Sequence, residues 1–246
     1  MNFFSHMGRY SCLLKKVFSK PEKFSIYYRR TIKEIDNLGI NSIGIVAIIS
    51  LFMGAVITIQ TAYNTENPFL PDYLIGLTAR DTLLLEFSST IVCLILAGKV
   101  GSNIASEIGT MRVTEQIDAL EVMGVNSASF LILPKVIGFV FIIPFLVVIS
   151  MFIGIVGGML AGSISNTISV HDYVYGIQYA FMPFYVIYAL IKSLFFAFII
   201  TTVSSYSGYF VSGGALEVGK ASTRAVVNSS VLILLFDLLL TQFLLG

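Results

Sequence analysis

The sequence predicts an all-α integral membrane protein. We expect an N-terminal interfacial amphipathic helix, five transmembrane helices and a cytoplasmic coupling helix between the second and third spans. Of the 246 residues, 56% are hydrophobic and 12% are charged, whereas a soluble domain carries about 25% charged residues. Long apolar runs recur along the chain, and one charged amphipathic stretch separates two of them. This composition excludes an ordinary cytosolic enzyme.

Five apolar runs approach or exceed the roughly 20 residues that a membrane-crossing helix needs. They extend roughly from Gly39 to Tyr63, Thr82 to Gly98, Val136 to Gly162, Phe184 to Ser207, and Ala225 to the C-terminus. Glu86 interrupts the second run and Asp237 interrupts the fifth. We therefore divide the chain into an N-terminal helical segment, residues 1–38, and a five-span membrane domain, residues 39–246.

The basic residues predict the orientation, because Lys and Arg accumulate in cytoplasmic loops. With five spans, thirteen of the fifteen Lys and Arg residues lie on one side, Arg80 lies on the other side, and Lys192 falls within the fourth span. The N-terminus is therefore predicted to be cytoplasmic, and the C-terminus is predicted to face the opposite compartment.

The N-terminal segment mixes basic residues with apolar and aromatic ones in two helical stretches separated near Pro21. This pattern is typical of a helix that lies along an anionic inner leaflet; a disordered basic tail is the alternative. No apolar region of adequate length follows the charges before Gly39, so a cleavable signal is not expected.

Residues 101–124 form the amphipathic stretch, which is the most informative about function. Its apolar residues recur at helical spacing and predict one stripe along one helical face: Ile108, Met111, Ile117, Leu120 and Met123. A loop needs such a stripe only if it lies on the membrane surface or docks into a partner. The residues predicted to couple to such a partner are Glu107, Met111, Arg112, Glu115, Gln116, Asp118, Leu120 and Glu121.

Three ionisable residues fall inside the predicted spans, where an uncompensated charge is costly. Glu86, Lys192 and Asp237 all lie about 9 to 13 Å below the outer ends of their spans, at 1.5 Å per helical residue. Two interpretations remain open: a packing cluster in which Lys192 bridges the two carboxylates, or a polar lining for a cavity that receives a lipid headgroup.

Small residues recur every fourth position in two places, and each set predicts a groove for close helix packing. The sets are Ala97, Gly101, Ala105 and Gly109, then Gly154, Gly158 and Gly162. Packing within the chain is favoured over a dimer contact.

The segment Gly214–Lys220 fits the frame of a phosphate-binding loop, but Ala221 stands where a Ser or Thr would hold Mg²⁺. The chain is therefore predicted to bind no nucleotide itself. His6 and His171 are isolated, so a metal site is not expected either.

The segment after the second span closely resembles the signature of the MlaE (YrbE) family of ABC-transporter permeases. The matching residues are Ala97, Gly98, Lys99, Gly101, Ser106, Glu107, Gly109, Met111, Thr114, Glu115, Gln116, Ala119, Leu120, Glu121 and Met123. The resemblance covers nearly the whole chain, including Ile191–Ser193 and the run from Ser222 to Asp237. One departure is Leu85–Ser89, where the family commonly reads R-E-L-G-P.

This resemblance implies a non-catalytic permease subunit that moves phospholipid or related lipid between a bacterial inner membrane and the outer envelope. It further implies a homodimer that works with a separate cytoplasmic ATPase, which binds the ATP, and with an MCE-domain protein and a small STAS-type accessory protein. The chain itself needs no cofactor and binds no nucleic acid. Glu86, Lys192 and Asp237 match family positions with functional intramembrane charges.

Two other classes of function remain open. An ATP-independent channel or secondary transporter would use the three intramembrane charges as an ion relay, and it should show paired internal repeats, which we do not find. A membrane scaffold that only anchors an MCE protein would leave those charges replaceable.

Overall fold

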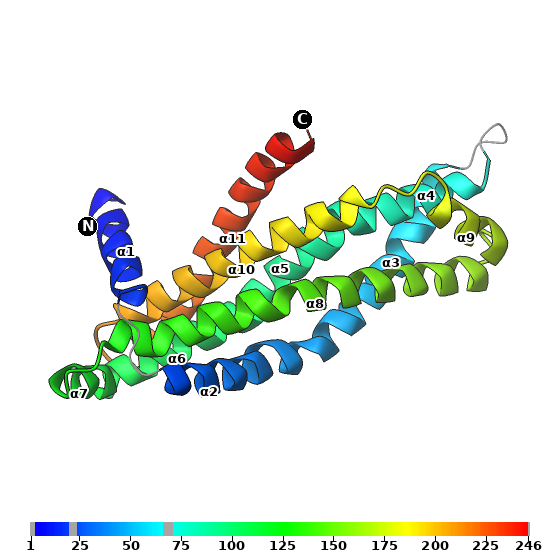
Figure 1. Cartoon of the computed structure of the whole chain (residues 1–246). Coiled ribbons are helices and arrows are strands. Elements are labelled where there is room, and N and C mark those ends of the chain that lie inside the picture. Colours follow the sequence, from blue (N-terminus) through cyan, green and yellow to red (C-terminus); the bar gives the residue numbers. More distant parts are fainter. Residues whose placement is uncertain (1–2, 20–23, 66–70, 246) are drawn as a thin grey trace. The chain divides into compact units, whose positions relative to one another are not determined.

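The computed structural model describes residues 3–19, 24–65 and 71–245. Every regular element in these ranges is a helix (Figure 1). Five helical stretches among the described residues are long and apolar enough to cross a membrane: Tyr27–Asn64, Tyr73–Val113, Ser127–Ile164, Phe184–Tyr209 and Ala215–Leu244. The predicted all-α class and the five spans are confirmed. Each helical stretch is longer than the apolar run that predicted it.

The N-terminal segment contains the two expected helices, α1 (Phe3–Val17) and α2 (Phe24–Glu34); Pro21 lies outside the described residues. Leu13 and Val17 of α1 are buried within the protein, so this helix packs one apolar face internally. Whether either helix also contacts lipid stays a prediction. The chain continues without a break through a π-helix, η1 (Ile35–Gly39), and a short 3-10 turn, η2 (Ile40–Ser42), into the first span, α3 (Ile43–Asn64).

The second span is helical throughout, but two π-helical stretches interrupt its α-helical winding. Its elements in chain order are α4 (Tyr73–Thr82), the π-helix η3 (Leu83–Ile91), α5 (Val92–Leu96), the π-helix η4 (Ala97–Gly101) and α6 (Ser102–Val113). A π-helix is rare and commonly marks a functional position in a helix. The segment that lacks the family's Gly and Pro, Leu85–Ser89, therefore forms part of a π-helix and not a helix break.

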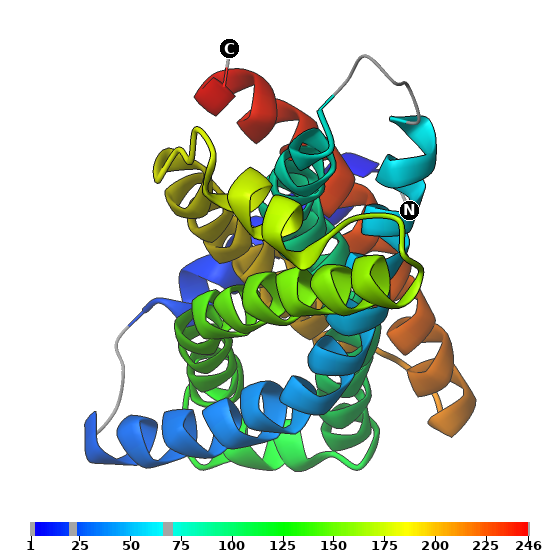
Figure 2. The same ribbon diagram turned by 90° about the vertical axis from the view of Figure 1, so that its right-hand side faces the viewer.

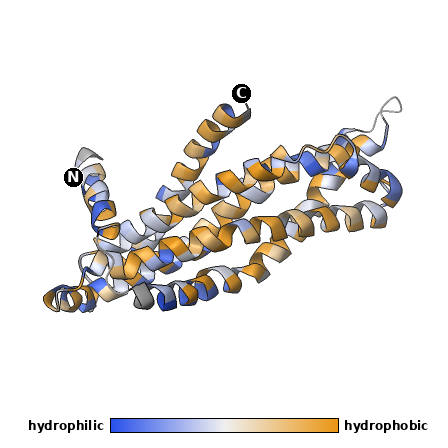
Figure 3. Ribbon diagram, in the orientation of Figure 1, coloured by the Kyte–Doolittle hydropathy of each residue, from blue (hydrophilic) through white to orange (hydrophobic). Residues whose placement is uncertain are grey.

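The remaining elements are simpler. They are α7 (Gln116–Val122), α8 (Ser127–Ile164), α9 (Val170–Gln178), α10 (Phe184–Tyr209) and α11 (Ala215–Leu245). Hydrophobic residues predominate along α8 and α10, whereas α7 carries hydrophilic residues (Figure 3). This contrast agrees with spans for the first two helices and with polar surroundings for α7.

The chain forms two compact units. Unit 1 contains Met1–Asn41, Leu94–Ile143 and Phe195–Gln242, and unit 2 contains Ser42–Cys93, Pro144–Leu194 and Phe243–Gly246. Boundaries between the units fall within α5, α8, α10 and α11, so each of these helices contributes residues to both units.

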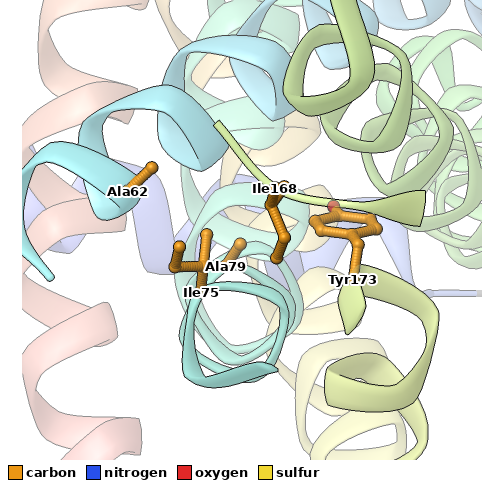
Figure 4. Close-up of a cluster of buried hydrophobic side chains, with 5 residues drawn as sticks. All are labelled: Ala62, Ile75, Ala79, Ile168 and Tyr173. Atoms are coloured by element: carbon orange, nitrogen blue, oxygen red, sulfur yellow. The ribbon is translucent and has the colours of Figure 1, made fainter. Parts of the chain in front are cut away.

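Unit 2 has a small apolar core where α4 lies beside α9 (Figure 2). The buried side chains are Ala62, Ile75, Ala79, Ile168 and Tyr173 (Figure 4). Glycine allows the two helices to approach closely, because a Cβ on Gly176 would lie 2.1 Å from the carbonyl oxygen of Tyr73.

The two predicted small-residue grooves pack within the chain. In unit 2, a Cβ on Gly54 of α3 would lie 1.9 Å from the carbonyl oxygen of Gly154 on α8. In unit 1, a Cβ on Gly208 of α10 would lie 2.6 Å from the carbonyl oxygen of Ala105 on α6. These distances leave no room for a methyl group, so backbone contact defines both packings.

Candidate functional site

The coupling segment is two helices joined by a tight turn. The first, α6, continues directly from the second span and ends at Val113. Glu115 then adopts a left-handed conformation with φ of 60°, and α7 begins at Gln116. A left-handed residue interrupts the helical hydrogen-bond ladder, so our expectation of one continuous helical stripe was wrong.

An ion pair spans this turn. A guanidinium nitrogen of Arg112, in α6, lies 2.5 Å from a carboxylate oxygen of Asp118, in α7. Both side chains are partly exposed, so the pair adds little stability by itself. It nevertheless orients α7 against the end of α6.

The apolar residues of the segment divide into buried and exposed ones. Ile108 and Ile117 are completely buried, whereas Val122 and Met123 are 88% and 67% exposed. Among the predicted coupling residues, Met111, Arg112 and Leu120 are partly buried, whereas Glu107, Glu115, Gln116, Asp118 and Glu121 are exposed. The exposed apolar surface is therefore the C-terminal tip of α7. Val122 could not be found from the sequence pattern, because it lies off the predicted stripe.

Glu121 fastens this tip to the rest of unit 1. Its Oε1 accepts hydrogen bonds from the hydroxyls of Ser127, at 2.9 Å, and Tyr209, at 3.0 Å. The Ser127 hydrogen bond is the largest influence on the Glu121 carboxyl and holds its pKa below the ordinary value; burial opposes this effect and the Tyr209 hydroxyl adds to it. Glu121 thus positions the tip.

The N-terminal end of the coupling segment is joined to two other helices by a buried lysine. Lys135 of α8 is 3% exposed, and its ammonium lies 2.7 Å from Glu107 of α6 and 2.8 Å from Glu34 of α2. No sequence pattern indicates this contact, because the three residues lie in separate segments. On sequence alone, Lys135 counts only as one of the cytoplasmic charges.

Two of the three predicted intramembrane charges meet in unit 2. The ammonium of Lys192, in α10, lies 3.2 Å from the carboxylate of Glu86, in η3. It also donates a hydrogen bond of 2.9 Å to the hydroxyl of Tyr188, one turn earlier in α10. Lys192 is completely buried, whereas the Glu86 side chain is 45% exposed.

Asp237 lies on α11, in unit 1, and is partly buried. Its membership of the cluster with Glu86 and Lys192 stays a prediction.

Thr90 adds a further contact to the Glu86–Lys192 pair. The hydroxyl of Thr90, which lies in η3 like Glu86, donates a hydrogen bond to the second carboxylate oxygen of Glu86 at 3.3 Å. The arrangement in unit 2 is therefore a compensated ion pair whose acidic member is the accessible one.

Serine hydroxyls tie the π-helix η3 to its neighbours in unit 2. Ser150 of α8 accepts a hydrogen bond of 2.8 Å from Ser50 of α3 and donates one of 3.4 Å to Ser88 of η3. These contacts satisfy hydroxyls in a region where unsatisfied polar groups are costly. They also fix the helix that carries Glu86.

Unit 1 contains a polar pocket of about 300 Å³ that sequence reasoning did not predict. It is lined from α1, the end of α10 and the start of α11, by residues that include His6, Arg9, Tyr206, Glu217 and Arg224. An imidazole nitrogen of His6 lies 2.8 Å from the hydroxyl of Tyr206. Cationic, anionic and aromatic groups thus line one space.

The profile of the MlaE permease family matches residues 31–243. The chain belongs to the MlaE permease family. Every site residue predicted from the sequence lies within the matched range, and so does Lys135. The first helix, α1, lies outside it.

Three relatives illustrate the breadth of the MlaE family. The chain is 37% identical to a probable ABC transporter permease protein of Rickettsia bellii, over 96% of this chain and 91% of the relative. It is 33% identical to the chloroplastic protein TRIGALACTOSYLDIACYLGLYCEROL 1 of Arabidopsis thaliana, over 90% of this chain and 63% of the relative. It is 28% identical to the intermembrane phospholipid transport system permease protein MlaE of Haemophilus influenzae, over 100% of this chain and 94% of the relative.

Proposed function

We propose that this protein is the membrane-spanning, non-catalytic subunit of an ABC transporter that moves phospholipid or a related lipid. Transport would run between the inner membrane and the outer envelope, with ATP hydrolysed by a separate polypeptide. The main support is the family match over residues 31–243, because it includes the spans, the coupling segment and the intramembrane charges. A similar protein from Haemophilus influenzae is named for phospholipid transport.

The exposed tip of α7 supports docking of a cytoplasmic ATPase. Val122 and Met123 present apolar surface beside exposed acidic side chains, and apolar surface with a polar rim is typical of a protein interface. ATP binding would close the two ATPase subunits, push on the coupling segment and reshape a lipid cavity between two copies of this chain.

The last span supports a homodimer. Only 11% of the residues in the apolar window of α11 are buried within the chain, against 61% for the second and fourth spans. Lys220, Arg224 and Asn228 share one helical face at intervals of four residues. In the predicted topology these polar residues lie at the cytoplasmic end of α11, before the apolar part of the span, which a second copy of the chain would cover.

The pocket and the Glu86–Lys192 pair support a lipid as the transported molecule. Each presents charged groups close to apolar surface, which is the character of a phospholipid. We place the protein in a bacterial inner membrane, with its N-terminus cytoplasmic. An MCE-domain protein and a STAS-type protein would complete the system.

The α7 tip provides the direct test of ATPase docking. Val122→Asp should release the ATPase during copurification while leaving the permease inserted, because Val122 is 88% exposed and packs in no core. The matched control is Val170→Asp, which places the same charge at the exposed first residue of α9. Retention of stoichiometric ATPase by Val122→Asp would refute the docking assignment. The lipid that copurifies from the native membrane should be identified in the same preparation.

A further inference from the structure

Four contacts within unit 1 hold α2 along the first part of α8. The hydroxyls of Tyr27 and Ser129 lie 3.0 Å apart. The guanidinium of Arg30 lies 3.5 Å from the centre of the Phe130 ring and donates a 3.3 Å hydrogen bond to the Phe130 carbonyl. Next along both helices is the Glu34–Lys135 ion pair, at 2.8 Å. The two helices are therefore joined over two turns.

The fourth contact is made by backbone. A Cβ on Gly138 of α8 would lie 3.2 Å from both the Glu34 Cβ and the Thr31 carbonyl oxygen. A Cβ at this distance would be closer to its neighbours than an ordinary van der Waals contact allows. Gly138 thus permits the approach that brings Glu34 against Lys135, one turn earlier on α8.

Lys135 connects this helix pair to the coupling segment. Its ammonium contacts Glu107 at 2.7 Å as well as Glu34 at 2.8 Å. One buried cation on α8 is therefore linked to both α2 and α6. The second oxygen of Glu34 is buried and has no hydrogen-bond partner among the described residues. Loss of Lys135 would therefore leave the Glu34 carboxylate, whose side chain is 15% exposed, without its ion-pair partner, which is unfavourable.

The ion pairs of Lys135 with Glu34 and Glu107 oppose separation of α2, α6 and α8. Moving α6 away from α8 would pull Glu107 from an ammonium that is 3% exposed and has little access to water. The ion pair weakens steeply with separation in such surroundings. Displacement of α6 should therefore move α2 and α8 with it.

We propose that Lys135 is a positioning residue that transmits movement of the coupling segment to the first and third spans. This inference rests on the proposed function, because it needs an ATPase that pushes on the segment. Through α2, the movement reaches α3, since the chain is helical without a break from Tyr27 to Asn64. Through α8, it reaches the third span directly. The Glu34–Lys135–Glu107 triad is thus the joint between the ATPase and the membrane helices.

The test measures lipid moved per ATP hydrolysed by the reconstituted complex. Lys135→Met and Glu34→Gln should each leave the ATPase bound and hydrolysing ATP, while the ratio of lipid to ATP falls about tenfold, in the range known for mutations that weaken coupling. Lys135→Arg keeps the charge and should stay within about twofold of the wild-type ratio. Lys33→Met is the matched control, because Lys33 is an exposed lysine on α2.

The outcomes distinguish a joint from a contact that only stabilises the fold. A purely structural role would lower thermal stability and leave the ratio unchanged in the folded fraction, and that result would overturn the inference. If Lys135→Met does not accumulate in the membrane, Glu34→Gln decides, because it removes one ion pair of Lys135 and leaves the pair with Glu107 in place. If the wild-type complex moves no lipid with ATP, the proposed function fails. If the wild-type complex moves lipid with ATP and Glu34→Gln keeps the wild-type ratio, only the joint fails.

Discussion

At the scale of single residues, the buried lysines of this protein lie against carboxylates that compensate their charge. Lys192 lies completely buried between a carboxylate and a tyrosine hydroxyl, and Lys135 lies between two carboxylates. Burial of a lysine is tolerated only when its charge is compensated. That charged residues fall within the long apolar helices was predictable from sequence. Which charges meet was not, because it depends on how distant segments pack.

The Glu86–Lys192 pair predicts non-additive substitutions. Lys192→Met and Glu86→Gln should each lower thermal stability, and the double variant should lose about 1–2 kcal/mol less than the sum, because the first substitution already removes the interaction. The control combines Lys192→Met with Asp172→Asn. Asp172 lies on α9 and accepts a local hydrogen bond from Ser169, the residue before that helix, so this pair of substitutions should be additive. Strict additivity in the first cycle would refute the pair as an energetic unit.

Glu121 predicts a specific dependence on acid. Its lowered pKa means that the folded state favours the ionised carboxylate more than the unfolded state does. The resulting stability is present above the unfolded pKa, about 4.3, and is lost as pH falls through the folded value. Glu121→Gln should therefore flatten the loss of thermal stability between about pH 5 and pH 3. The same change at exposed Glu115 serves as the control, and equal curves for wild type and Glu121→Gln would contradict this role of Glu121.

At the scale of helices, close backbone contact and irregular winding define the elements. The small-residue patterns from Ala97 to Gly109 and from Gly154 to Gly162 correctly predicted packing within the chain. The periodicity of residues 101–124 misled, because a pattern compatible with one helix says nothing about a left-handed residue at Glu115. The π-helix at Leu83–Ile91 was likewise not predictable, since apolar and hydroxyl residues there fit an α-helix equally well.

The contact of α3 with α8 predicts a sharp difference between two glycines of one helix. Gly54→Ala should destabilise the protein by about 1–3 kcal/mol or more, because its methyl group would overlap the Gly154 carbonyl. Gly44→Ala should be neutral or stabilising by up to about 1 kcal/mol, since nothing lies within 4 Å of its added Cβ. Thermal unfolding in detergent measures both. Similar effects at the two positions would show that α3 does not pack on α8 as described.

At the scale of the whole molecule, hydropathy predicted five spans, and the described residues contain five helical stretches long and apolar enough to cross a membrane. The helices are longer than the predicted apolar runs, because they continue past the apolar residues into polar segments such as α2 and α6. Orientation, oligomeric state and partners are decided outside a single chain. They remain predictions that rest on the distribution of charge and on family membership.

The predicted topology can be tested by labelling cysteines from one side. In a background of Cys12→Ser and Cys93→Ala, Met123→Cys should react only from the cytoplasm, and His171→Cys only from the opposite side. Both original side chains are well exposed, so access should not limit the reaction when the chain is expressed without its ATPase. A cysteine added after Gly246 should behave like position 171. Labelling of positions 123 and 171 from the same side would contradict the assignment of the third span.

ATP hydrolysis by a partner should drive lipid movement through this chain. Transport can be followed with a labelled phospholipid in proteoliposomes that contain the complex copurified from its native membrane. We expect movement that requires ATP and that stops when the ATPase is released by Val122→Asp. Lipid movement at the same rate without ATP, or with the ATPase removed, would show that the chain does not work as the permease of an ATP-driven transporter.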